Sequence, residues 1–402
     1  MAIHRSKSFR VGERLTVTIE KIAHGGHFIA RHEGQVIFVR HAIPGEIVEV
    51  EITGTGASFV RADAIRILDA SPNRVLPPCS FSYPGGCGGC DFQHIAIHRQ
   101  RELKAEVIRE QFSRIAKREI AVTVEEIGQP LHWRTRVSSA TDASGKIGFY
   151  ASRTHTVIPV NDCIIAASGI NYPNLAQRKW PAGSRIEVSV STTGARAIAI
   201  ADAARGARAR LTEGAAISRE EVPGHSLQVS QASFWQSHES APAILSAAVC
   251  EFIREGDHVL DLYGGVGLFA AAMIDIVGVD GKVELIESST TAIADARRNF
   301  VDYPNILIHS GEVSRLLPNI DRADVIVLDP PREGAGREVI LKIALLAPRA
   351  IVYVACDPAA LARDTVYLQE SGFDLNQLRA YDLFPMTHHV ECVALFTPFQ
   401  KG

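Results

Sequence analysis

From Ser226 onward, apolar runs typical of buried strands alternate with segments typical of helices. The runs are HVLDLY, KVELIE, NILIHSG, DVIVLDP and AIVYVAC, and most precede a segment with helical spacing, such as STTAIADARRNF. Strands that alternate with helices form a mostly parallel sheet with helices on both faces. The sequence therefore predicts an α/β, doubly wound (Rossmann-like) domain over residues 226–402. Ligands of such a sheet bind at the carboxyl ends of its strands.

A glycine-rich turn, DLYGGVGLFA, follows the first of these strands. Gly264, Gly265 and Gly267 let the backbone turn sharply and approach a ligand closely, next to the amino end of a helix. Glu287 ends the following strand, where a carboxylate can accept hydrogen bonds from both hydroxyls of a ribose. These features predict a ligand that contains adenosine, and both NAD and S-adenosylmethionine fit them.

The fourth strand ends in LDPPREGAG, which favours S-adenosylmethionine. The glycine turn is not G-x-G-x-x-G, and no long second mononucleotide half follows it. Asp329 ends this strand before two prolines, so its side chain would face the reactive end of the cofactor. Enzymes that methylate exocyclic amines commonly carry an aromatic residue after the two prolines. Arg332 occupies that position, which argues against that reaction.

Cys356 ends the fifth strand, in IVYVACDPAALARD, and so reaches the same edge of the sheet. We expect a helix to begin near Pro358, with an amino end that lowers the pKa of the thiol. A cysteine can also be a small buried hydrophobic residue, which is our interpretation of Cys250 and Cys392. At Cys356 the cofactor edge, Asp329 and a helix start converge, which favours a nucleophile.

A methyltransferase with a nucleophilic cysteine suits a uracil ring. Carbon 5 of uracil is not nucleophilic enough to take a methyl group directly, but thiolate addition at carbon 6 makes an enolate whose carbon 5 can. A base must then remove the carbon 5 proton so that the thiol can leave. The segment YDLFPMTHHVECV offers Glu391 as this base, with His388 and His389 beside it.

The first half of the chain has a different pattern and predicts two further domains. Over residues 1–70, short alternating runs between glycine and proline turns predict an OB-like β-barrel, a shape that often binds oligonucleotides. A proline-rich linker, SPNRVLPPC, then opens a small β-rich central domain over residues 71–225. Within it, residues 95–116 have the spacing of an amphipathic helix, and we expect its apolar stripe to pack on the catalytic domain.

The motifs LDPPREGAG, VACDPAALARD and DLFPMTHHVE, in that order, resemble the RNA uridine-C5 methyltransferases, which form 5-methyluridine in ribosomal and transfer RNA. The resemblance spans nearly the whole chain, and the first segment is similar to the RNA-binding TRAM barrel of that family. It implies a class I methyltransferase domain with Cys356 as the nucleophile, Glu391 as the proton acceptor and Asp329 facing the target base. Together with the glycine turn, the expected S-adenosylmethionine contacts are Gln236 (in FWQSH), Tyr263, Gly265, Gly267, Glu287 and Asp329.

Two positions depart from the family pattern. The usual Asn after the nucleophile is Asp357, and the usual Asn of the glutamine motif is His238. An acid beside a thiolate raises the pKa of the thiol unless the acid is turned toward a backbone donor.

Three of the seven cysteines are bunched in CSFSYPGGCGGCDFQH: Cys79, Cys87 and Cys90. In a reducing compartment such a bunch indicates a metal or cluster site rather than disulfides. The resemblance implies a structural [4Fe-4S] cluster on these three cysteines and Cys163. Zinc, with His94 replacing one thiolate, is the competing occupant.

The formal net charge of −3 and the pI of about 6.6 give no global basic field, so RNA must be held by a local basic surface. No apolar run is long enough to span a bilayer, and the first residues lack a signal-peptide core. We therefore expect a cytoplasmic monomer that has no membrane partner and modifies structured ribosomal or transfer RNA. The phosphate-binding candidates are Arg99, Arg101, Arg109, Arg114, Arg134 and Arg136.

Two alternatives remain at this stage. The first is an amino-directed RNA or DNA methyltransferase in which Cys356 is inert. The second is a catalytically inactive iron–sulfur protein that binds RNA.

Overall fold

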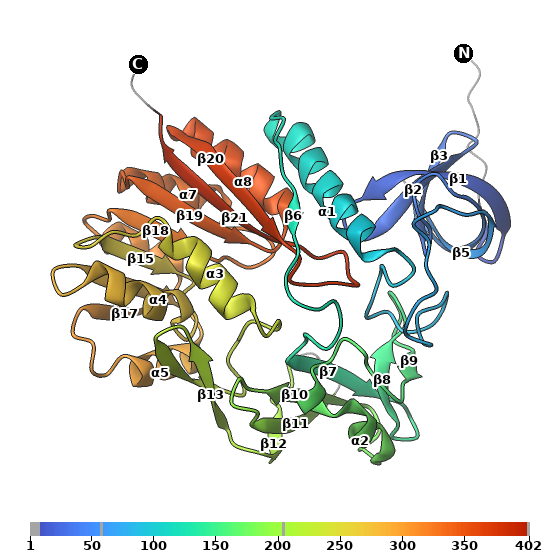
Figure 1. Ribbon diagram of the computed structural model, residues 1–402, viewed down its shortest axis with the longest axis horizontal. Helices are drawn as coiled ribbons and strands as arrows, with labels where there is room; N and C mark the ends of the chain where they lie inside the picture. Colours follow the sequence, from blue (N-terminus) through green and yellow to red (C-terminus); the bar gives the residue numbers. More distant parts are fainter. Residues whose placement is uncertain (1–8, 57–58, 203–205, 400–402) are drawn as a thin grey trace.

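The computed structural model describes residues 9–56, 59–202 and 206–399 (Figure 1). Its first part is a closed five-stranded barrel with the strand order β1-β2-β3-β5-β4. The alternating sequence puts Phe28, Ile37 and Val48 inside this barrel, where each is fully buried. The strands are β1 (Arg14–Ala23), β2 (His27–His32), β3 (Gln35–Arg40), β4 (Ile47–Thr55) and β5 (Val60–Asp69).

A helix, α1 (Ile97–Gln111), lies between the barrel and the catalytic sheet and continues into one π-helical turn, η1 (Phe112–Ala116). Its Leu103 is buried in the core of the barrel, whereas Ile108 is buried in the core of the catalytic domain. The helix therefore has two apolar faces and joins the two domains.

The central part of the chain forms a six-stranded antiparallel sheet of order β12-β11-β10-β7-β8-β9. Its strands are β7 (Arg136–Thr141), β8 (Ile147–Tyr150), β9 (Val157–Pro159), β10 (Ser184–Val190), β11 (Arg196–Asp202) and β12 (Arg210–Glu213). Two short helices, η2 (Ser168–Ile170) and α2 (Tyr172–Gln177), accompany this sheet.

A hairpin of β13 (Ile217–Val222) and β14 (His225–Ser230) leads into the catalytic domain. Val222, Leu227 and Val229 of this hairpin are buried in the catalytic core. The boundary expected between residues 225 and 226 therefore lies inside the hairpin.

The last part is an eight-stranded sheet of order β17-β16-β15-β18-β19-β21-β20-β6, with its first five strands parallel. This confirms the doubly wound fold predicted from the sequence, to which β21 is added antiparallel to β19, followed by β20 antiparallel to β21. The strands are β15 (His258–Leu262), β16 (Lys282–Glu287), β17 (Ile306–Ser310), β18 (Val325–Leu328), β19 (Ala350–Ala355), β20 (Phe373–Tyr381), β21 (Glu391–Pro398) and β6 (Val124–Glu125).

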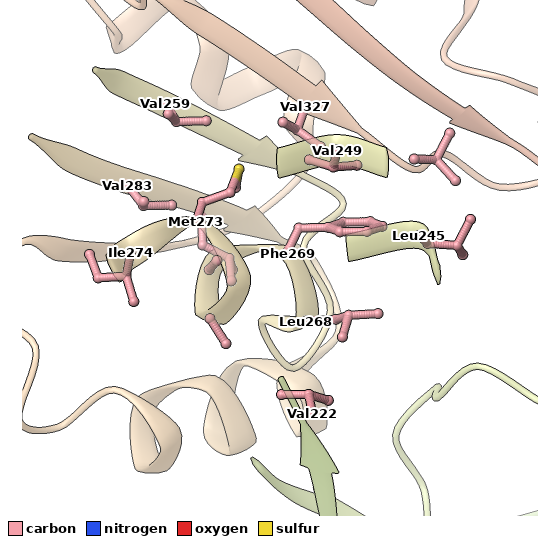
Figure 2. Close-up of a cluster of buried hydrophobic side chains, with 14 of the residues drawn as sticks. Val222, Leu245, Val249, Val259, Leu268, Phe269, Met273, Ile274, Val283 and Val327 are labelled. Carbon is pink, nitrogen blue, oxygen red and sulfur yellow. The ribbon is translucent and has the colours of Figure 1, made fainter. Parts of the chain in front are cut away.

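Helices cover both faces of the catalytic sheet. On one face, Phe269 and Met273 of α4 pack between Val259 and Val283 of the sheet and Leu245 of α3 (Figure 2). In the described residues, no helix has the length and apolar character needed to cross a membrane. The helices of this domain are α3 (Ala241–Cys250), α4 (Leu268–Val277), α5 (Thr290–Asn299), α6 (Val313–Leu316), η3 (Leu317–Asn319), α7 (Gly336–Leu345) and α8 (Pro358–Glu370).

Candidate active site

The glycine turn joins β15 to α4 and needs an unusual backbone. Tyr263, Gly265 and Gly267 have positive φ angles of 62°, 57° and 96°. A Cβ atom on Gly267 would lie 2.2 Å from the ring of Phe300, and one on Gly264 would lie 2.6 Å from Leu285. The turn therefore depends on glycine for both its conformation and its close packing.

Glu287 is fixed by backbone donors at the tip of β16. Its carboxylate accepts hydrogen bonds from the N–H groups of Gly265 at 3.0 Å, Ser288 at 2.8 Å and Ser289 at 2.6 Å. A carboxylate held in this way is preorganised to accept the ribose hydroxyls of an adenosine ligand.

The strand register brings Glu287 and Asp329 to one edge. Leu262 of β15 pairs with Ile286 on one side and with Leu328 on the other, so the next residues, Tyr263, Glu287 and Asp329, are neighbours. The residues predicted to contact the cofactor thus share the carboxyl edge of the sheet: Tyr263, Gly265, Gly267, Glu287 and Asp329. Gln236 is buried on the segment between β14 and α3, and its side chain forms no hydrogen bond with the described residues.

Asp261 lies beneath the glycine turn and was not a sequence candidate. It is fully buried and accepts a hydrogen bond from the N–H group of Ala270 at 3.1 Å, and its other oxygen has no partner among the described residues. Burial raises its pKa to about 8. This oxygen is a buried polar atom of β15 beneath the glycine turn, which fits a site made for a polar ligand.

Cys356 and Glu391 face each other across two antiparallel strands. Ala355 of β19 pairs with Cys392 of β21, so the next opposite pair in this register is Cys356 with Glu391. Asp329 follows β18, which pairs with β19, and after burial its charge adds to the raised pKa of both Cys356 and Glu391. The structure thus brings the expected nucleophile, base and substrate-binding acid together.

The electrostatics correct one expectation, namely that the helix start would lower the pKa of Cys356. Burial raises this pKa to about 12, and Glu391, Asp329 and Asp357 add to the effect, opposed by Arg332. A helix amino end contributes only about 1 kcal/mol. Burial and three carboxyls outweigh it, so the resting group is a neutral thiol.

Burial also raises the pKa values of Glu391 and Asp329. The pKa of Glu391 lies well above its ordinary value, with Asp329 adding to the effect and Arg332 opposing it. The pKa of Asp329 rises to about 7. Burial therefore favours the protonated form of both carboxyls, and Arg332 opposes this effect at Glu391.

Asp357 is turned toward backbone donors, although its charge still adds to the raised pKa of Cys356. Its Oδ1 accepts hydrogen bonds from the N–H groups of Ala359 and Ala360 and caps α8. Its Oδ2 bonds His24 Nε2 at 3.0 Å. The departure from the family pattern therefore serves as a helix cap and as a link to the barrel. His238 stacks on Trp133 and accepts a hydrogen bond from the N–H group of Ser240.

The barrel forms one wall of the catalytic cavity, a feature that the sequence did not reveal. A cavity of about 130 Å³ is lined by Cys356, by the last two residues of β1 and by residues 24–26 of the β1–β2 turn. Arg332, His388 and His389 line it from the catalytic domain, and Lys104 lines it from α1. A Cβ atom on Gly26 would lie 2.9 Å from His388, so the turn packs tightly against this wall.

The four predicted cluster ligands line one cavity of about 250 Å³: Cys79, Cys87, Cys90 and Cys163. Burial raises the pKa of Cys163 to about 11 and also raises the pKa values of Cys87 and Cys90. Among the described residues, no three His, Cys, Asp or Glu side chains are close enough to hold a single metal ion. His94 lies outside this cavity and bonds Ala42 O at 3.0 Å, so the zinc site expected with His94 is not formed.

The arginines expected to bind phosphate are engaged within the protein. Arg99 and Arg101 form ion pairs with glutamates, and Arg109 donates to Val122 O. Arg134 and Arg136 donate to backbone carbonyls. The sequence could not distinguish these structural arginines from free ones.

Comparisons with known proteins agree with this geometry. Residues 8–65 match the TRAM domain, and residues 226–398 match the tRNA (uracil-5-)-methyltransferase family. An RNA methyltransferase of Streptomyces avermitilis is 43% identical, covering 98% of this chain and 100% of its own length. The chain belongs to the tRNA (uracil-5-)-methyltransferase family. The methyltransferase is also 29% identical to the 23S rRNA (uracil(1939)-C(5))-methyltransferase RlmD of Shewanella amazonensis, over 96% of each chain.

The methyltransferase also has a solved structural relative. The Pyrococcus abyssi tRNA (uracil-54, C5)-methyltransferase, in complex with S-adenosyl-L-homocysteine, aligns with a TM-score of 0.74 at 21% identity. This alignment covers 95% of the present chain and 100% of the other, so the fold is shared throughout. The methyltransferase is an S-adenosylmethionine-dependent RNA (uracil-C5-)methyltransferase with an amino-terminal TRAM domain, which confirms the family and activity expected from the sequence.

Proposed function

We propose that this enzyme methylates carbon 5 of a uridine in structured RNA through covalent catalysis by Cys356, with Glu391 as the base. The observation that carries the proposal is the cross-strand opposition of Cys356 and Glu391 beside Asp329. In this arrangement Cys356 can add to carbon 6 of the ring while Glu391, opposite it, reaches the neighbouring carbon 5.

In the first step, Sγ of Cys356 bonds to carbon 6 of uracil, and the electrons of the carbon 5–carbon 6 double bond move to form the enolate. Asp329 accepts the thiol proton, because its pKa of about 7 leaves a fraction ionised at neutral pH. Bound S-adenosylmethionine supplies the methyl group that carbon 5 takes up.

In the last step, Glu391 removes the remaining proton from carbon 5. The electrons of that bond re-form the double bond, and Sγ leaves carbon 6. Glu391 must be ionised for this step, and Arg332 favours its ionised form. Arg332 lines the catalytic cavity, at the position where an amine methylase would carry an aromatic ring, and there supplies a positive charge.

The residues described above fit S-adenosylmethionine and an iron–sulfur cluster. The glycine turn and Glu287 would hold the adenosine part, with Gln236 and Tyr263 as further contacts. The four cysteines would hold a [4Fe-4S] cluster, because four thiols line one cavity while the thiols are too far apart for a single ion. The cluster would fix the loop that carries Cys90. The next residues of this loop, Asp91 and Phe92, donate their N–H groups to the carbonyl oxygen of Met386.

The substrate to test first is 23S ribosomal RNA, because a relative of 29% identity over nearly full length acts on it. Transfer RNA is the second, on the basis of the P. abyssi relative. A deletion strain would lack one 5-methyluridine, and its position in total RNA identifies the substrate.

The mechanism is tested by trapping RNA that contains 5-fluorouridine, which has no carbon 5 proton to lose. The wild-type enzyme should form a stable covalent complex, and Cys356→Ala should form none and methylate no uridine. Glu391→Gln should accumulate a covalent complex with ordinary uridine, because the adduct cannot eliminate. Cys250→Ala, a change at a partly buried cysteine on α3, is the matched control and should trap as wild type does. Full activity in Cys356→Ala would refute the mechanism.

A further inference from the structure

A cavity of about 280 Å³ lies between the barrel and the central domain, apart from the catalytic cavity. Its barrel side comprises residues from β2, β3, β4 and β5, and its other side comprises Gly85 and residues 151–154 of the turn between β8 and β9. In Figure 1, β8 and β9 lie below the barrel at the right of the molecule. We call this cavity the arginine cleft.

Three arginines line the arginine cleft: Arg40, Arg61 and Arg153. Burial lowers the pKa of Arg153, and repulsion from Arg61 and Arg40 lowers it further. Asp63 is the one carboxylate among the described residues that line the cleft, and burial raises its pKa. The cleft therefore concentrates positive charge.

The partners of these arginines leave that charge largely unmatched. Arg40 is 9% exposed and shares Asp91, at 3.4 Å, with His388. The guanidinium of Arg61 lies 4.2 Å from the ring centroid of Phe59. Within the described ranges, neither Arg61 nor Arg153 forms an ion pair with a carboxylate. Three guanidinium groups around one cavity, with Asp63 as the acid that lines it and Asp91 shared with His388, leave an excess of positive charge that suits an anion.

His27 supplies a second, independent sign of a ligand. Its ring lines the cleft and is 8% exposed, and its Nδ1 bonds Gly25 O at 2.9 Å. The carbonyl fixes Nδ1 as the protonated nitrogen, so Nε2 of the neutral ring is an acceptor, and it has no partner among the described residues. A buried acceptor beside free guanidinium groups matches a hydroxyl next to a phosphate, as in a ribonucleotide.

The arginine cleft and the catalytic cavity are neighbours. Gly25 and Gly26 of the β1–β2 turn line the catalytic cavity, and the next residue, His27, lines the cleft. Asp91 also connects the two, because it bonds both Arg40 in the cleft and His388 in the catalytic cavity. A strand with one base in the catalytic cavity would therefore pass the cleft with its backbone.

We propose that the arginine cleft binds a sugar–phosphate segment of the RNA substrate close to the target uridine. The phosphate lies between Arg61 and Arg153, and the adjoining ribose hydroxyl donates to Nε2 of His27. Contacts of this kind fix the register of the strand without reading its sequence. This inference rests on the proposed function, since it concerns the same RNA.

The test measures binding without methyl transfer, by fluorescence anisotropy of labelled oligouridylate 12-mers with the full-length chain. Arg61→Ala/Arg153→Ala should weaken binding of the ribonucleotide about tenfold at low salt. For one lost phosphate contact, the slope of log affinity against log salt should fall by about 0.7. Arg66→Ala, which removes an exposed arginine of the same strand β5 outside the cleft, is the matched control and should change little. Thermal unfolding midpoints verify that the variants are folded.

A second arm uses the 2′-deoxy 12-mer. The wild-type enzyme should bind it several-fold more weakly than the ribonucleotide, and His27→Phe should remove most of that difference. Wild-type affinity and salt slope in the double arginine variant, or an equal loss in Arg66→Ala, would overturn the proposal. Trapping of 5-fluorouridine RNA by the wild-type enzyme tests the proposed function separately. If the wild-type enzyme is trapped but the double arginine variant binds RNA normally, only the role of the cleft is refuted. If the wild-type enzyme is not trapped, the proposed function fails.

Discussion

The protonation state of Cys356 gives a prediction that separates two accounts of the active site. Burial raises the pKa of this thiol from its ordinary value of 9.0 to about 12. One pH unit corresponds to about 1.4 kcal/mol, and solvent reaches part of this side chain and screens its charge, so ionising the thiol in the free enzyme costs about 2–4 kcal/mol more than ionising an exposed one. At pH 8, only a very small fraction of Cys356 thiols would be ionised.

The assay is alkylation by iodoacetamide between pH 7 and 11, followed by mass spectrometry of the peptide that contains Cys356. The rate should rise about tenfold per pH unit through pH 10, because only the thiolate reacts. Glu391→Gln removes a neighbouring carboxylate and should move this rise to lower pH. Arg332→Gln removes a favourable cation and should move it to higher pH. A rate that levels off below pH 9 in the wild-type enzyme would refute the reasoning, and the thiolate would then be preformed.

Three further changes test the cofactor turn, the link between domains and the cysteine cavity. Gly267→Ala puts a Cβ atom 2.2 Å from Phe300 at a φ of 96°, so calorimetric affinity for S-adenosylmethionine should fall at least tenfold; unchanged affinity would contradict this account of the turn. Lys104→Met leaves Asp382 buried without its partner at 2.5 Å and should lower the free energy of unfolding by about 3–5 kcal/mol in urea, with recovery in Lys104→Met/Asp382→Leu. Anaerobically purified wild-type enzyme should absorb broadly near ~400 nm and Cys163→Ser should not, whereas a featureless wild-type spectrum would exclude the cluster.

Much of the catalytic sheet could be predicted because its signals are local. Each buried strand carries an apolar run, and its last residue reaches the carboxyl edge whatever the rest of the chain does. For this reason Glu287, Asp329 and Cys356 could be assigned to one edge from the sequence. The position of Glu391 opposite Cys356 needed the antiparallel register of β21, which no local pattern reveals.

The prediction that the pKa of Cys356 would be lowered was wrong for a related reason. The helix start after Cys356 is a local feature and was predicted, but the burial of the thiol and the approach of Glu391 and Asp329 depend on distant segments. The His24 contact with Asp357 likewise joins residues far apart in the sequence. Properties set by tertiary packing were therefore the ones that the sequence missed.

The distribution of arginines explains how a chain with a net charge of −3 can hold RNA. Arginines on α1, such as Arg99, lie at helical spacing from glutamates, which neutralise them locally. Arg61 and Arg153 come from different domains and meet only when the barrel packs against the central sheet, where no acid in the described part of the chain forms an ion pair with them. Attraction for a phosphate falls off within about 10 Å at 0.1 M salt, so the charge of the cleft outweighs the charge of the whole chain. The salt dependence of binding by Arg61→Ala/Arg153→Ala therefore tests the origin of RNA affinity more directly than any change in net charge.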